Sequence, residues 1–149
     1  MMTPVEAYWQ NFCEQNQLVD AHLYAAFGFG MSKDMQNELA QLVVDGTKRG
    51  TASALALYED DEAKPQVGDY SIILDGDSQP VAVIQTTQVE ILPFNAITEA
   101  HAKREGEGDL SLAYWQQAHI AFFEPLFKEV KQRDFKSDDL ILFETFERK

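Results

Sequence analysis

Apolar side chains in the first third of the chain recur at the spacing of helices. Residues 4–17 place apolar side chains on one side of a helix, and Thr3-Pro4-Val5-Glu6 has the form of a capping box with proline in the first turn. A second helical pattern fills residues 33–45, where Ser32 is a suitable N-cap and Gly46 a suitable stop. We therefore predict two helices before residue 50.

The spacing then changes to the alternation of strands. Apolar residues alternate with polar or small ones over 51–58, and strand-like apolar and β-branched runs follow at 70–74 and 81–91. The sequence Asp75-Gly76-Asp77 predicts a hairpin turn between the last two segments. Alternating apolar residues return at 140–147 and predict a final strand. The middle and the end of the chain are thus expected to form one antiparallel sheet.

A helical pattern separates these strands. We expect a short helix at 98–104, a loop at 105–109 and a long helix after it, capped by Asp109 or Ser111 and kinked or broken at Pro125. Its apolar face consists of Leu112, Trp115, His119, Phe122, Phe123, Leu126 and Phe127. The order of helices, strands, helices and strand predicts an α+β class, with the strands curled into a small β-barrel of about five to six strands.

Composition limits where the protein can act. The 149 residues fit a single domain (1–149), and a hydrophobic content of 45% supports a core. The start lacks a signal peptide, no apolar run could span a membrane, and the single cysteine, Cys13, fits a reducing compartment, so we expect a cytoplasmic protein with no membrane partner. A net charge of −13 disfavours a broad nucleic-acid groove, and we expect no DNA partner.

The segment 46–53 carries the most suggestive chemistry, because a helix ends there and a strand begins. Lys48 can act as a cation, or as a base if burial makes its amine neutral, and Thr51 offers a hydroxyl that such an amine can activate. Ordinary helix termination, with Lys48 and Arg49 complementing the helix dipole, is the alternative.

The acidic segment 105–109 is a second candidate. Its glycines permit a close approach to a ligand, although it lacks the spacing of a calcium loop, and a solvated acidic turn is the alternative. His22, His101 and His119 show no metal spacing, so no metal or other cofactor is expected. Tyr114, just after this segment, can stack on a base.

Together these segments resemble the ASCH domain family, which has a PUA-like β-barrel flanked by helices, and within it the longer bacterial YhfF-like branch. The family signature, glycine-x-lysine-x-x-threonine, is present as Gly46, Lys48 and Thr51. Further matching segments are Phe29-Gly30, Val67-Gly68-Asp69, Asp75-Gly76, Pro80-Val81-Ala82-Val83-Ile84, Glu105-Gly106-Glu107-Gly108-Asp109, and Trp115 with His119. Two positions depart from the family pattern: Ser53 replaces a frequent arginine, and Met31 replaces an aspartate.

The resemblance implies a cleft that faces RNA or a nucleoside. ASCH amidohydrolases that deacetylate N4-acetylcytidine use a lysine, a threonine and a glutamate, which correspond here to Lys48, Thr51 and Glu105 as catalytic residues. The expected ligand-binding residues around them are Arg49, Ser53, Lys103, Arg104, Asp109 and Tyr114. The leading hypothesis is a hydrolase of a modified pyrimidine nucleoside; the alternatives are a non-catalytic module for single-stranded RNA and a ribonuclease.

Overall fold

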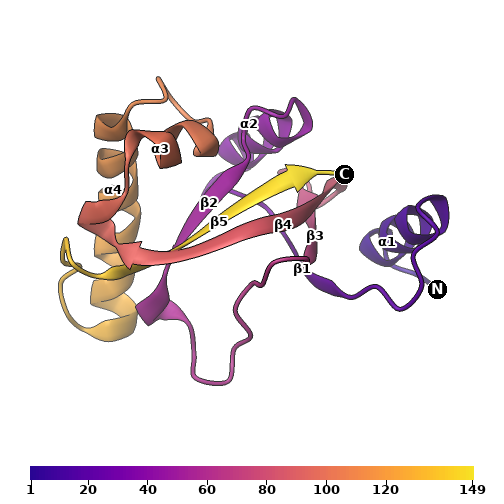
Figure 1. Cartoon of the computed structure of the whole chain (residues 1–149), viewed down its shortest axis with the longest axis horizontal. Coiled ribbons are helices and arrows are strands. Elements are labelled where there is room, and N and C mark those ends of the chain that lie inside the picture. Colours follow the sequence, from indigo (N-terminus) through magenta and orange to yellow (C-terminus); the bar gives the residue numbers. More distant parts are fainter.

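The computed structural model describes all residues, Met1–Lys149, as four α-helices and five strands (Figure 1). The helices are α1 (Pro4–Gln15), α2 (Lys33–Val44), α3 (Glu99–Glu105) and α4 (Leu112–Lys131). The strands are β1 (Leu23–Phe27), β2 (Gly50–Ala54), β3 (Tyr70–Leu74), β4 (Pro80–Pro93) and β5 (Leu140–Arg148). The α+β class is therefore confirmed.

The strands form one mixed sheet in the order β1-β3-β4-β5-β2. β1 pairs in parallel with β3, and the other pairs are antiparallel. β1 and β2 lie at the two edges and do not pair, so the sheet is open and the expected closed barrel is wrong. Side chains from both edge strands line a cavity instead, and this cavity takes the place of the pairing that would close the sheet.

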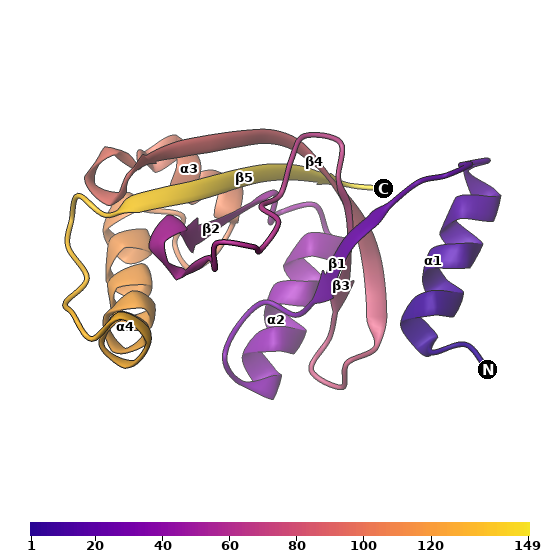
Figure 2. The same ribbon diagram turned by 90° about the horizontal axis from the view of Figure 1, so that it is seen from below.

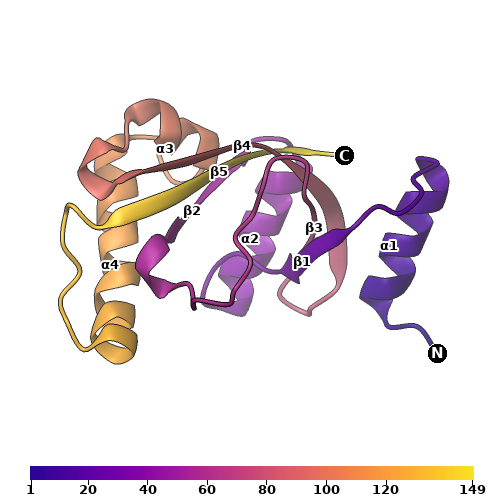
Figure 3. The same ribbon diagram turned by 60° about the horizontal axis from the view of Figure 1, so that its bottom comes forward.

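The long strand β4 joins the two parts of the sheet. Its first half pairs with β3 and its second half with β5, and the register shifts between Thr86 and Gln88. Such an irregularity increases bending and twist. Figures 2 and 3 show β4 and β5 crossing the molecule, with α4 beside one end and α1 beyond β1 and β3 at the other.

Two clusters of buried side chains hold the sheet to its helices. One joins α3 and α4 to the β2 end, and its members are Ala54, Phe94, Ile97, Ala102, Trp115, Phe123, Phe127, Ile141 and Phe143. The other joins α2 to β3 and β4 and consists of Phe29, Leu39, Ala40, Val43, Ile73, Ala82, Ile84 and Phe146. Two separate clusters leave room for polar groups between them.

Local structure follows the sequence signals at most helix ends. The side chains of Thr3 and Ser32 accept hydrogen bonds from backbone N–H groups at the starts of α1 and α2, and Ser111 does so at α4. Pro125 lies inside α4, which continues to Lys131, so the expected break is absent. No helix is long and apolar enough to cross a membrane.

Three local predictions differ from the structure. The strand expected over 51–58 ends at Ala54, and Leu55–Leu57 form a 3₁₀ turn. β1 was not predicted, because its five residues show no alternation: all are half-buried. Glu105 is the last residue of α3 rather than the first residue of a loop.

Candidate functional site

A tight turn after α2 directs Lys48 into the protein. Gly46 has φ +82°, a left-handed conformation that suits glycine. The backbone N–H groups of Thr47 and Lys48 both donate to Leu42 O. The turn leaves only 2% of Lys48 exposed. Ordinary helix termination does not account for this burial, because a lysine that only complements a helix dipole can remain in water.

The ammonium of Lys48 has a partner for each of its three hydrogens. It donates to Gly50 O at 2.9 Å, to Glu107 Oε2 at 2.7 Å and to Glu105, whose Oε1 lies at 3.3 Å and whose backbone O lies at 3.4 Å. It also lies 4.7 Å from the centre of the Phe29 ring. Such complete pairing is what a buried charge requires.

Glu105 links this lysine to α4. Its Oε1 receives Lys48, while its Oε2 receives the Trp115 indole N–H and lies 3.2 Å from His119 Nε2. Burial acts to raise the pKa of Glu105, but the charge of Lys48 and the hydrogen bonds from His119 and Trp115 outweigh it and lower this pKa to about 2. Glu105 is therefore a carboxylate at neutral pH, and the solvated acidic turn is wrong for this residue.

His119 is the second polar group of this cluster on α4. Its Nδ1 lies 2.8 Å from Trp115 O, and its ring stacks on the Trp115 ring with centroids 4.0 Å apart. Burial alone would lower the pKa of His119, yet the hydrogen bond and charge of Glu105 raise it above its ordinary value. The arrangement fixes the ring and directs Nε2 at Glu105.

Thr51 lies where two cavities meet. The smaller, about 360 Å³, is lined by Thr51 together with Lys48, Glu105, Glu107 and His119. The larger, about 540 Å³, lies between β1, β2 and α4. Thr51, Ala52, Phe29, Gly30 and Phe122 line both. Thr51 is therefore shared by the larger cavity and by the smaller cavity that contains the lysine cluster.

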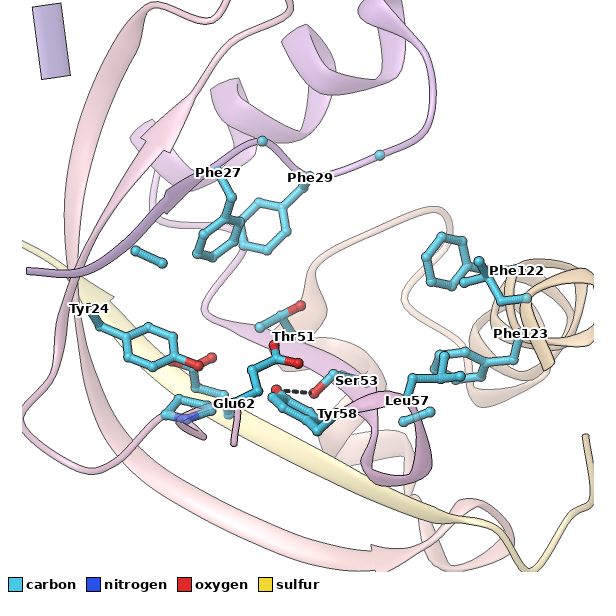
Figure 4. Close-up of a pocket in the computed structure, with 18 residues that line it drawn as sticks. Tyr24, Phe27, Phe29, Thr51, Ser53, Leu57, Tyr58, Glu62, Phe122 and Phe123 are labelled. Atoms are coloured by element: carbon cyan, nitrogen blue, oxygen red, sulfur yellow. Dashed lines mark hydrogen bonds between the residues drawn. The ribbon is translucent and has the colours of Figure 1, made fainter. Parts of the chain in front are cut away.

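The larger cavity has aromatic walls and polar groups below them (Figure 4). Phe27 and Phe29 lie on one side of Thr51, and Phe122 and Phe123 of α4 lie on another. Tyr24, Tyr58, Ser53, Glu62 and Glu144 supply the polar atoms. No lysine or arginine lines this cavity, so its charged side chains are acidic.

The polar floor is held in place by hydrogen bonds. The hydroxyl of Ser53 lies 2.9 Å from that of Tyr58, and Tyr24 donates to Ala63 O at 2.6 Å. Glu144 accepts a short hydrogen bond from Thr86 through Oε1. Burial is the main reason why the pKa of Tyr24 rises to about 12 and the pKa of Glu144 also rises.

Of the nine predicted site residues, four line these cavities: Lys48, Thr51, Ser53 and Glu105. The other five lie outside both. Arg49, Lys103 and Asp109 are exposed, Tyr114 is 41% exposed beside Gly108, and Arg104 pairs with Glu90 at 3.3 Å and with the Thr145 hydroxyl at 2.8 Å.

The site also contains four residues that were not predicted from the sequence as site residues. Glu107, Trp115 and His119 complete the lysine cluster, and Glu144 lies in the floor of the larger cavity. The four-residue spacing of Trp115 and His119 is visible in the sequence, but it places both on the apolar face of a helix, where a core residue has the same pattern. No group of three or more His, Cys, Asp or Glu side chains is placed to hold a metal ion.

Comparison with known proteins identifies one family over most of the chain. The family model described as "ASCH domain" matches residues 25–148. A crystal structure of a protein from Enterococcus faecalis, described under the family DUF984, shares 41% identity and covers 100% of this chain and 90% of its own, with a TM-score of 0.89. A crystal structure of an ASCH domain from Lactobacillus crispatus shares 29% identity, with 99% and 95% coverage and a TM-score of 0.92.

One more distant structure shows the fold alone. The hypothetical protein PH0355 shares 12% identity and covers 84% of this chain and 98% of its own, with a TM-score of 0.54. Among curated proteins, no match was found.

Proposed function

Because the chain belongs to the ASCH domain family, which has a PUA-like fold and a proposed role in RNA binding, we propose that it hydrolyses the N-acyl group of a modified pyrimidine nucleoside such as N4-acetylcytidine. One observation carries this proposal: Thr51 lies between an aromatic cavity large enough for a nucleoside and a buried Lys48–Glu105–Glu107 cluster. Pockets for small ligands have volumes of roughly 300–1,000 Å³.

In the proposed first step, Thr51 Oγ1 attacks the acyl carbonyl carbon and its proton passes to the Lys48 amine. The carbon–nitrogen bond of the tetrahedral intermediate then breaks, and Lys48 returns that proton to the departing nitrogen. The acyl group remains on Thr51 as an ester. Water attacks the ester, the carboxylic acid leaves, and Thr51 Oγ1 regains its proton.

Lys48 accepts a proton only when its amine is neutral, and its resting ammonium donates all three hydrogens. The nearest acceptor is Glu107 Oε2 at 2.7 Å, and the Glu107 side chain is 18% exposed. In this proposal Glu107 is the group placed to take the proton that Lys48 must lose before the attack, and it returns that proton to Lys48 after the acyl group has left. Glu105, with both oxygens engaged, holds Lys48 in position and stays ionised, and His119 and Trp115 orient Glu105.

The charges of the cavity favour a nucleoside over a polynucleotide. Glu62 and Glu144 are the charged residues that line the larger cavity, and Lys48 in the smaller one is neutralised by two carboxylates. A phosphate backbone needs exposed lysine and arginine along its path. A neutral nucleoside carries no phosphate and therefore needs no lysine or arginine in the cavity.

The test follows loss of N4-acetylcytidine by chromatography for the wild-type protein, Lys48→Ala and Thr51→Val. We expect kcat/KM to fall by about 10³-fold or more in both variants, since each removes a group that acts in the reaction. Thr51→Val removes only the hydroxyl and keeps the side-chain shape. Thr87→Val, at an exposed threonine of β4, is the matched control and should stay within about twofold.

Absence of turnover by the wild-type protein would exclude this substrate. Turnover that survives Thr51→Val would remove the threonine from the mechanism.

A non-catalytic RNA-binding module is the second candidate, and one observation favours it. The backbone N–H of Arg49 donates to Arg104 O at 2.6 Å. This hydrogen bond joins the start of β2 to the end of α3, so the backbones of Arg49, Lys103 and Arg104 lie near one another. These cations lie outside the cavities. A ribonuclease would use the same site, with Lys48 stabilising the charge that develops on phosphate, and RNA cleavage that persists in Lys48→Ala would contradict it.

A further inference from the structure

Glu144 has surroundings that are costly for a carboxylate. It is 8% exposed and lies in the floor of the larger cavity. No cation pairs with it, and its nearest charged neighbours are acidic: Asp69 acts on it from the loop before β3, and Glu62 lines the same cavity. A buried charge without a counter-charge lowers stability. Folding alone gives no reason to place it there.

Only one oxygen of Glu144 is used within the protein. Oε1 accepts from the Thr86 hydroxyl, and Oε2 has no hydrogen-bond partner. Every side-chain oxygen or nitrogen that is wholly inaccessible in this protein has a partner. Oε2 is therefore accessible, and the cavity that Glu144 lines offers the space for a hydrogen-bond donor.

The sheet places Glu144 directly beside the proposed nucleophile. Thr51 of β2 lies opposite Glu144 of β5 in the antiparallel register. Opposite residues point to the same face with Cβ atoms about 4.5–5.5 Å apart. A ligand that bonds to Glu144 therefore also lies close to Thr51.

We propose that Glu144 determines specificity by accepting a hydrogen bond from the exocyclic amino or amide N–H of a nucleobase, whose ring lies between the aromatic walls of the larger cavity. The inference rests on the proposed function for the identity of the ligand. In an N-acylated base, the N–H that Glu144 receives belongs to the nitrogen that leaves, and the neighbouring carbonyl carbon is presented to Thr51.

The chemistry of the walls supports a flat, uncharged ring. The aromatic side chains Phe27, Phe29 and Phe122 line the cavity, and Tyr24 and Tyr58 lie near the Glu144 carboxylate. Stacking on aromatic side chains contributes roughly 1–3 kcal/mol per base. Because the charged side chains of this cavity are acidic, an anionic ligand is excluded and an N–H donor is favoured.

The experiment measures binding of cytidine and of 3-methyluridine, whose base carries no N–H, by isothermal titration calorimetry. We expect wild-type protein to bind cytidine more tightly, and Glu144→Gln to weaken cytidine binding at least fivefold, with little change for 3-methyluridine. Glutamine retains an acceptor for Thr86 but removes the charge that strengthens the bond to the ligand. Glu147→Gln, at an exposed glutamate of the same strand, is the matched control and should stay within twofold.

These outcomes separate this inference from the proposed hydrolysis. Cytidine binding that depends on Glu144, without turnover of N4-acetylcytidine, would leave the recognition site standing and remove the hydrolase. No cytidine binding by the wild-type protein, or equal binding by Glu144→Gln, would overturn the inference.

Discussion

The ion pairs around Lys48 set the pH range in which the site holds together. Glu105 and Glu107 balance the lysine, and His119 adds a second positive charge when it is protonated. The side chains of Lys48 and Glu105 are 1% and 3% exposed, so water does not screen their interaction. Loss of Glu105 leaves Lys48 with Glu107 as its one carboxylate, and loss of Lys48 leaves Glu105 with His119 and Trp115. Breaking a buried ion pair costs roughly 3–5 kcal/mol.

Titration of this cluster should make stability depend on pH in both directions. The folded pKa of Glu105, about 2, is below its unfolded value, so its contribution is present above the unfolded pKa and is lost as pH falls toward 2. The folded pKa of His119 is raised, so its contribution is present below the unfolded pKa and is lost as pH rises through the folded value.

We therefore expect Glu105→Gln to lower the free energy of unfolding by roughly 3 kcal/mol near pH 6, with a smaller difference at pH 3. Urea denaturation of both proteins at several pH values measures it. Glu124→Gln, at an exposed glutamate of α4, should show no such pH dependence. A difference that is constant from pH 3 to pH 6 would contradict the assigned pairing.

At the scale of elements, two glycine turns hold the lysine cluster together. Gly46 ends α2 and Gly106 ends α3, with φ +82° and +71°. The turns differ in their surroundings: a methyl group on Gly106 would lie 2.4 Å from Thr47 O, whereas nothing lies within 4 Å of one on Gly46. The close approach at Gly106 brings α3 against the segment that carries Lys48.

We predict that Gly106→Ala destabilises the protein by about 3 kcal/mol and Gly46→Ala by about 1 kcal/mol. Both variants place a side chain on a residue in the left-handed conformation, but only Gly106→Ala also forces the backbone at Thr47 to move. Thermal or chemical denaturation measures both values. In the proposed hydrolysis, Gly106→Ala should also reduce turnover, because it displaces Lys48. Equal losses for the two variants would show that the contact with Thr47 is not tight.

The elements also show where sequence reasoning succeeds. Helices with caps and strong periodicity, such as α1 and α2, could be predicted, because local signals determine their ends. β1 could not, because it is short and half-buried along its whole length and pairs with β3, which lies 46 to 47 residues later. Its position depends on tertiary contacts that periodicity does not record.

The same division applies to the site. The chemistry of the segment 46–53 indicates Lys48 and Thr51, the resemblance adds Glu105 as their partner, and the structure brings all three around one cavity. Glu144 gave no signal, because in sequence it is one polar position in an alternating strand; its burial becomes visible only when β2 and β5 pair. His119 lies on an apolar helical face, where a core residue and a site residue have the same pattern.

For the whole molecule, net charge decides between the two proposed ligands. A charge of −13 repels a polyanion, and neither cavity presents an exposed cation. We therefore expect a short single-stranded RNA to bind weakly, with an affinity that changes little between 50 and 200 mM salt. A module that contacts phosphates through the three cations Arg49, Lys103 and Arg104 would instead show a slope of about −2 in a plot of log affinity against log salt.

Fluorescence anisotropy with a labelled RNA dodecamer tests this expectation. A steep slope that Lys103→Ala and Arg49→Ala reduce would favour the RNA-binding module and count against a nucleoside as the natural ligand. Glu124→Gln and a surface lysine far from the site, Lys33→Ala, are suitable controls, since Lys33 pairs with Asp77 beside the β3–β4 turn.

The unpaired edges of β1 and β2 leave the sheet open at the larger cavity. No backbone pairing spans the gap between these two strands. A ligand that touches Tyr24 on one edge and Thr51 on the other would bridge this gap. We therefore expect β1 and β2 to move less relative to each other when the cavity is filled than when it is empty.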